Sequence, residues 1–148
     1  MPARGDRVAD DEACVRYVPP RYTDNDMIDG GAFQLRDIDK GELSVNLLGT
    51  NDAGYEAAMQ QVRQLFRLTV KKSGRFAQLE VAEVRAAFTE AAQLAALDVI
   101  HDPLPAEGRH AADSSHAAII NLPSPGSEYA ALAGDLLAEK IRRLHPAI

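Results

Sequence analysis

Histidine, aspartate and serine side chains gather in one polar segment of the chain, between two short apolar runs. The runs cover 97–100 and 117–120, and their length and β-branched content predict two strands. If these strands pair antiparallel, the end of the first lies beside the start of the second. Four residues would then meet at one rim of a sheet: His101, Asp102, Ser115 and His116. This rim is the best candidate for a catalytic site.

Two kinds of chemistry fit these side chains. In the first, Asp102 orients His116 as a general base, and the hydroxyl of Ser114 or Ser115 is the nucleophile. In the second, a divalent metal activates water, with ligands drawn from His101, Asp102, His110, Asp113 and His116. The chain has no GxSxG elbow and no short ligand spacing that would specify either site. No cofactor is required by any motif, and a structural role for these residues stays open beside the catalytic one.

A second feature is a run of positive charge. Residues 57–79 include five basic and no acidic side chains: Arg63, Arg67, Lys71, Lys72 and Arg75. Such a patch could bind a phosphate, a nucleic-acid backbone or an acidic partner surface. The alternative interpretation is a solvated helix end whose cations complement the helix dipole.

Arginine also occurs in or beside predicted strands, at Arg16, Arg36 and Arg75. In such places arginine can hold a carboxylate or phosphate with two parallel hydrogen bonds. It can equally lie on the wet face of an antiparallel sheet, where polar residues point outward.

Composition narrows the class of protein. The formal net charge of −6 disfavours nucleic-acid binding as a property of the whole surface, so nucleic acid would bind only at the local basic patch. The single cysteine, Cys14, excludes an internal disulfide and fits a reducing compartment. No run approaches the ~20 apolar residues of a membrane span. We therefore expect a cytoplasmic protein that does not insert into membranes.

The pattern along the chain predicts an α+β fold. Residues 1–13 should form a flexible N-terminal arm, and 14–148 a single domain. Strands are expected at 14–18, as an edge strand, at 32–36 and 42–48, as a hairpin, and at 75–81. Helices are expected at 53–67, 80–96 and from Ser127 to about Ile141. The predicted architecture is a mostly antiparallel sheet with about three helices packed on one face.

Several short motifs together resemble a group of uncharacterised short bacterial proteins. They are Arg16-Tyr17-Val18, Ala32-Phe33 with Leu35-Arg36, Leu43-Ser44-Val45-Asn46, Gly74-Arg75-Phe76-Ala77, His101-Asp102-Pro103 and Ser115-His116-Ala117. The resemblance covers most of the chain from Arg16 onward and implies no activity or site residue. It implies a context, since such proteins are often accessory components of mobile or conflict-related gene clusters.

Two functions follow as hypotheses. The first is a small protein-interaction module, an accessory or regulatory subunit of a multi-component bacterial system, which binds a protein partner. The second is a small hydrolase or nuclease-like effector that uses His101, Asp102 and His116, with the basic patch holding phosphate.

Overall fold

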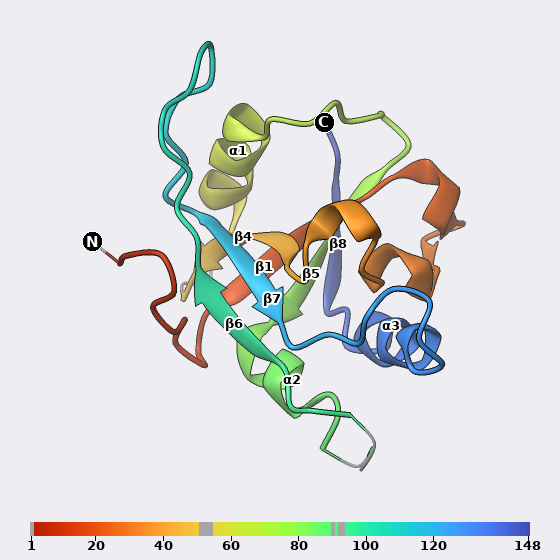
Figure 1. Cartoon of the computed structure of the whole chain (residues 1–148). Coiled ribbons are helices and arrows are strands. Elements are labelled where there is room, and N and C mark those ends of the chain that lie inside the picture. Colours follow the sequence, from red (N-terminus) through yellow and green to blue (C-terminus); the bar gives the residue numbers. More distant parts are fainter. Residues whose placement is uncertain (1, 51–54, 90, 92–93) are drawn as a thin grey trace.

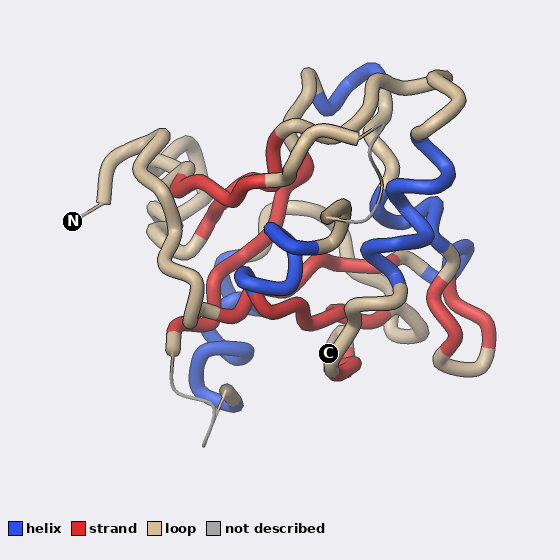
Figure 2. The backbone as a smooth tube through the Cα atoms, turned by 90° about the horizontal axis from the view of Figure 1, so that it is seen from below, coloured by secondary structure: helices blue, strands red, loops and turns tan. Residues whose placement is uncertain are grey.

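Six antiparallel strands form the centre of the molecule, in the order β6-β7-β4-β1-β5-β8 (Figure 1). The computed structural model describes residues 2–50, 55–89, 91 and 94–148. The strands are β1 (Ala13–Val18), β4 (Leu43–Gly49), β5 (Arg75–Glu80), β6 (Asp98–His101), β7 (His116–Ile120) and β8 (Arg143–Pro146). A separate two-stranded hairpin of β2 (Thr23–Asp24) and β3 (Met27–Ile28) projects beside the sheet (Figure 2). The predicted α+β class and mostly antiparallel sheet are confirmed.

Helices cover both faces of the sheet. On one face, Met59 and Val62 of α1 (Glu56–Leu65) pack with Val15 and Phe76. On the other face lie α2 (Val81–Ala86) and α3 (Ala130–Ala138), in one core with Cys14 and its neighbours in the sheet. The prediction that all three helices share one face is wrong. Adjacent residues of a strand point to opposite faces, and both Cys14 and Val15 are buried, so each face needs its own cover.

The first strand lies inside the sheet and not at its edge. β1 pairs with β4 on one side and with β5 on the other. Pro19 and Pro20, which suggested an edge, come just after the strand, so they remove no donor from either ladder. The strand is therefore buried on both faces and paired on both sides.

Residues 32–36 do not form the predicted hairpin strand. The chain there begins with a 3-10 helix, η2 (Gly30–Phe33). The carboxylate of Asp29 accepts a hydrogen bond from the Gly31 amide at 2.7 Å and caps this turn. Local capping outweighs the extended pattern of the sequence here, and Phe33 becomes part of the core.

The helices are shorter than predicted. α1 ends at Leu65, and the predicted start at Ala53 lies outside the described residues. α2 ends at Ala86, and α3 ends at Ala138. The chain then turns and forms β8, where the buried His145 bonds Gln78 of β5 at 2.8 Å. The apolar positions up to Ile141 fit one face of a helix, so the sequence predicts a helix that runs past Ala138 and no strand after it.

The segment before β1 packs along β6 and does not extend away as a loose arm. The amide of Val8 donates to the Val99 carbonyl oxygen at 3.0 Å, and Val8 is fully buried. Gly5 and Asp6 exchange backbone hydrogen bonds with His101. The burial of Val8 and these backbone hydrogen bonds offset the conformational entropy that the segment loses when it is ordered. Its neighbour β6 pairs with β7 as the sequence predicts.

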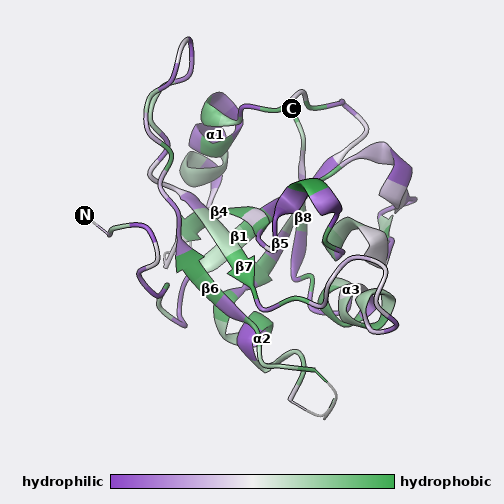
Figure 3. Ribbon diagram, in the orientation of Figure 1, coloured by the Kyte–Doolittle hydropathy of each residue, from purple (hydrophilic) through white to green (hydrophobic). Residues whose placement is uncertain are grey.

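The β6–β7 connection forms a long loop that rises beside α1 and in which hydrophilic and hydrophobic residues alternate (Figure 3). Arg67, just after α1, donates to the carbonyl oxygens of Pro105 and Ala111 in this loop, at 2.7 and 3.0 Å. None of the helices in the described part of the chain has the length and apolar character needed to cross a bilayer.

Candidate functional site

A cavity of about 350 Å³ opens where β1 and β4 separate. The register of the two strands runs from Ala13↔Gly49 to Val15↔Asn46. Beyond that pair, the Arg16 side chain lies between the strands. Its Nε donates to the carbonyl oxygen of Ala32 in η2 at 2.7 Å, and its Nη1 donates to that of Ser44 in β4 at 2.8 Å. Arg16 thus links three segments around the cavity.

The guanidinium of Arg16 keeps donors for a ligand. Arginine has five N–H groups, and the two bonds to Ala32 and Ser44 use two of them. No carboxylate forms an ion pair with Arg16 anywhere in the described residues. Burial lowers the pKa of Arg16 to about 10, so the group is still cationic at neutral pH. The cavity therefore contains a positive charge that is bonded to neutral carbonyls alone.

The lining of the cavity combines positive charge with apolar surface. Four arginines and two aspartates contribute to it: Arg16, Arg21, Arg36, Arg67, Asp39 and Asp113. Asp39 pairs with Arg36 at 3.3 Å, and Asp113 is engaged by neutral donors. Phe66, Leu68 and Leu104 form apolar wall. The local charge is positive although the whole chain is acidic.

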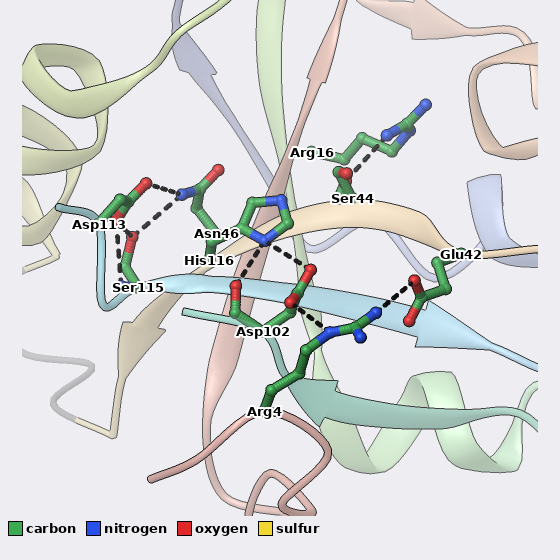
Figure 4. Close-up of polar contacts among 9 residues, drawn as sticks. All are labelled: Arg4, Arg16, Glu42, Ser44, Asn46, Asp102, Asp113, Ser115 and His116. Atoms are coloured by element: carbon green, nitrogen blue, oxygen red, sulfur yellow. Dashed lines mark hydrogen bonds and ion pairs between the residues drawn. The ribbon is translucent and has the colours of Figure 1, made fainter. Parts of the chain in front are cut away.

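His116 of β7 lies on the same cavity and contacts Asp102. Its Nδ1 is 2.9 Å from the backbone carbonyl oxygen of Asp102 and 3.3 Å from Oδ2 of the same residue. Both atoms are acceptors, so Nδ1 carries the proton in the neutral ring and Nε2 has the free lone pair. Figure 4 shows this second nitrogen turned away from Asp102, toward the side on which Arg16 and Ser44 lie. The structure thus brings together two of the four rim residues as the sequence predicts.

Asp102 is itself fixed by the N-terminal segment. The Nε of Arg4 donates to Oδ1 of Asp102 at 2.9 Å, and its Nη2 donates to Oε2 of Glu42 at 3.2 Å (Figure 4). The Asp102 side chain is 18 % exposed and that of His116 is 14 % exposed. The ion pair with Arg4 restrains the Asp102 carboxylate and, through it, the imidazole ring of His116.

Ser115 is engaged elsewhere. Its Oγ donates to Oδ1 of Asp113 at 2.6 Å, and its amide donates to the same oxygen. Asn46 donates from Nδ2 to Oδ2 of Asp113 and to Oγ of Ser115, each at 3.0 Å. This network is buried, with Asp113 2 % and Asn46 4 % exposed. The structure therefore does not place the Ser115 hydroxyl on His116, and the network supports the cavity wall.

Asn46 was not anticipated from the sequence as part of the site. It is an amide within an otherwise apolar strand centre, and it lies opposite His116 in the β4–β7 ladder. A polar residue in a buried strand needs a partner. That interruption of the apolar pattern was the signal in the sequence.

The other two histidines of the segment lie apart from the cavity. His101 lines a separate hollow of about 280 Å³ with Gln61 and Ser114. His110 lies exposed at the tip of the long loop, bonded through its backbone to Glu107. Within the described residues, no group of three or more His, Cys, Asp or Glu side chains has the geometry to hold a metal ion. The five candidate metal ligands are thus not brought into one coordination sphere.

The five residues of the predicted basic patch have different surroundings. Arg63 donates to the carbonyl oxygen of Pro146, Arg67 to the loop carbonyls, and Arg75 pairs with Asp26 at 3.2 Å. Lys71 and Lys72 are exposed, and no ion pair of either is found in the described part of the chain. Three of the five cations therefore hold segments together, and Arg67 also reaches the cavity wall.

Cys14 is not a candidate nucleophile. The thiol is fully buried in the core on the face of the sheet that α2 and α3 cover, and burial raises its pKa to about 12. A thiol of that pKa is protonated at neutral pH and unreactive.

No protein-family model, curated protein or solved structure matches the chain. The resemblance to short bacterial proteins accordingly stays a hypothesis.

Proposed function

We propose that this chain is a small binding module whose cavity receives one anionic group, a phosphate or a carboxylate. The observation that supports this most strongly is the Arg16 guanidinium, which lines the cavity and is bonded to two carbonyl oxygens and to no carboxylate of the described chain. Arg16 is half-buried, and desolvation lowers its pKa while the nearby Asp39 carboxylate, which forms no ion pair with it, raises it. An entering anion would add a direct counter-charge and form charge-assisted hydrogen bonds.

The remaining contacts favour a planar or tetrahedral oxyanion. Arg16 is held at Nε and Nη1, so its free donors have a restrained direction. Arg36 lies at the same cavity and is balanced by Asp39. The apolar wall of Phe66, Leu68 and Leu104 suits a ligand with an apolar part next to its charge. This composition is typical of a pocket that recognises a substituted phosphate or carboxylate.

In this role the chain would act as the recognition component of a larger system, which is the accessory function that the sequence suggests. The anionic group could belong to a small molecule or to a partner protein. A cytoplasmic location, where phosphorylated ligands are abundant, is part of the same proposal.

Isothermal titration calorimetry with phenyl phosphate and benzoate tests the proposal. We expect saturable 1:1 binding of at least one probe, weakened by salt. Arg16→Gln should lower the affinity by about tenfold or more, because charged hydrogen bonds contribute about 1.5–3 kcal/mol. Arg16→Lys keeps the charge but loses the fixed fork of donors, and should bind with intermediate affinity.

The matched control is Arg109→Gln, which removes the same charge from the exposed tip of the long loop. It should bind as the unmodified protein does. If Arg109→Gln and Arg16→Gln weakened binding equally, the change in net charge alone would explain the loss of affinity. That result would contradict the proposed site. The absence of binding of either probe by the unmodified protein would also contradict it.

A further inference from the structure

The free nitrogen of His116 can accept a proton from a ligand in the cavity. Nδ1 is committed to two acceptor oxygens of Asp102, so Nε2 has the lone pair in the neutral ring. His116 and Arg16 line the same cavity, and Nε2 is turned away from Asp102 (Figure 4). A base and a cation that forms no ion pair within the described residues thus line one cavity.

Among the described residues, the nucleophiles that the sequence offers are engaged or lie elsewhere. Of the two serines that the sequence offers as nucleophile, Ser115 donates its hydroxyl to Asp113 at 2.6 Å, and Ser114 lines the separate hollow with His101. Cys14 is buried in the core. None of these side chains is placed to give its proton to His116, and a hydroxyl of a bound substrate would supply one.

We propose that His116 is a general base that acts on a phosphodiester with a neighbouring hydroxyl, which is the linkage of single-stranded RNA. This inference rests on the proposed anion site, because Arg16 would bind the phosphate. A ribonucleotide linkage supplies both requirements of the cavity, the anion for Arg16 and the 2′-hydroxyl for His116. The apolar wall at Phe66 and Leu68 offers a surface for an unstacked base.

The size of the cavity favours a single strand. A volume of about 350 Å³ lies near the lower end for sites that take drug-sized groups, which corresponds to one nucleotide unit and not to paired strands. The arginines around the opening make the local potential positive, while the net charge of −6 disfavours binding elsewhere on the surface. RNA contact would thus be confined to this side of the molecule.

The reaction is an intramolecular transesterification. His116 Nε2 takes the proton of the 2′-hydroxyl while the 2′-oxygen attacks phosphorus, which forms a new P–O bond. The bond from phosphorus to the 5′-oxygen breaks, and that oxygen takes a proton from water. The products are a 2′,3′-cyclic phosphate and a free 5′-hydroxyl, and His116 then releases its proton to solvent. Arg16 stabilises the added negative charge on the phosphoryl oxygens as it develops.

The test is cleavage of a fluorophore–quencher labelled 12-nucleotide RNA of mixed sequence, in buffer with EDTA. We expect cleavage that ends in 2′,3′-cyclic phosphate, identified by mass spectrometry. DNA and 2′-O-methyl RNA of the same sequence should stay intact because they lack the nucleophile. His116→Ala should lower the rate by about 100-fold or more, the usual contribution of a positioned base.

Matched variants separate catalysis from folding and from contaminating nucleases. His110→Ala removes an exposed histidine from the loop tip and should cleave at the unmodified rate after the same purification. Asp102→Asn should lower kcat with KM unchanged, since Asp102 positions the imidazole without touching substrate. If His116→Ala unfolds, His116→Gln serves in its place.

Three results would overturn the inference: no RNA cleavage by the folded protein, cleavage that persists in His116→Ala, or equal cleavage of DNA. Phenyl phosphate or benzoate binding without RNA cleavage would reject the catalytic role alone. If the unmodified protein bound neither phenyl phosphate nor benzoate in calorimetry, that result would instead reject the anion site on which the catalytic role rests.

Discussion

The Nδ1 atom of His116 lies 2.9 Å from the backbone carbonyl oxygen of Asp102 and 3.3 Å from Oδ2 of the same side chain. The two residues come from opposite ends of a long loop and meet because β6 and β7 pair antiparallel. Arg4 and Glu42 extend this relationship into a chain of charged contacts. The orientation of one imidazole ring thus depends on the N-terminal segment, two strands and a loop.

The contact predicts the tautomer of His116. Because both neighbouring oxygens are acceptors, the neutral ring should carry its proton on Nδ1. Long-range ¹⁵N–¹H correlation spectra of the histidine side chains measure this directly. His110, exposed at the loop tip, provides the reference for an unrestrained ring in the same sample. A His116 spectrum dominated by the Nε2–H form would contradict the assigned geometry and remove the base from the cavity.

A close approach between α3 and η2 supports the wall that holds Arg16. A Cβ added at Gly134 would press against the carbonyl oxygen of Gly30, and η2 carries the Ala32 carbonyl to which Arg16 donates. Gly134→Ala should therefore lower the free energy of unfolding by about 1–3 kcal/mol and weaken phenyl phosphate binding. Urea denaturation and calorimetry measure the two effects.

Ala131→Ser, on the exposed side of the same helix, is the control and should change stability by less than about 0.5 kcal/mol. If Gly134→Ala were as stable as the unmodified protein and bound the probe equally well, η2 would not depend on this contact.

His145 predicts how stability changes with pH. Its ring is buried against Gln78, and burial lowers its pKa, with Arg143 and Arg63 acting in the same direction. The unfolded chain then binds a proton near pH 6.5 while the folded chain resists it. The associated stability is complete above pH 6.5 and is lost as the pH falls toward the folded pKa.

Urea denaturation between pH 7.5 and 5 should show this loss, at up to about 1.4 kcal/mol per pH unit from this residue. His145→Gln should have a flatter profile, and His110→Gln should keep the slope of the unmodified protein. An identical slope in His145→Gln would assign the acid sensitivity to other groups.

The sequence predicts the rim better than the elements around it. Antiparallel pairing of 97–100 with 117–120 was enough to bring Asp102 and His116 together, because strand register follows from the apolar pattern. The apolar pattern could not predict the partner of the Ser115 hydroxyl, because a local turn places the Asp113 carboxylate next to it. The reach of His101 into a separate hollow depends on side-chain direction at a strand end, which spacing does not determine.

Arg16 shows a different limit. Its position in a strand beside aromatic residues left two interpretations open, a ligand clamp and a wet sheet face. The choice depended on where β1 and β4 separate and on η2, which capping by Asp29 forms in place of the predicted strand. Both are tertiary or local capping effects that the alternation of apolar residues does not report. The cavity could therefore be recognised only in three dimensions.

The most direct test of the anion site observes the Arg16 guanidinium itself. In ¹⁵N–¹H spectra of the arginine side chains at neutral pH, inorganic phosphate is titrated into the protein at low salt. We predict that the Arg16 signals shift along a saturable curve and that those of Arg109, at the exposed loop tip, do not. Arg16 signals that stay in place, or that move only as much as those of Arg109, would contradict the proposal that this cavity binds anions.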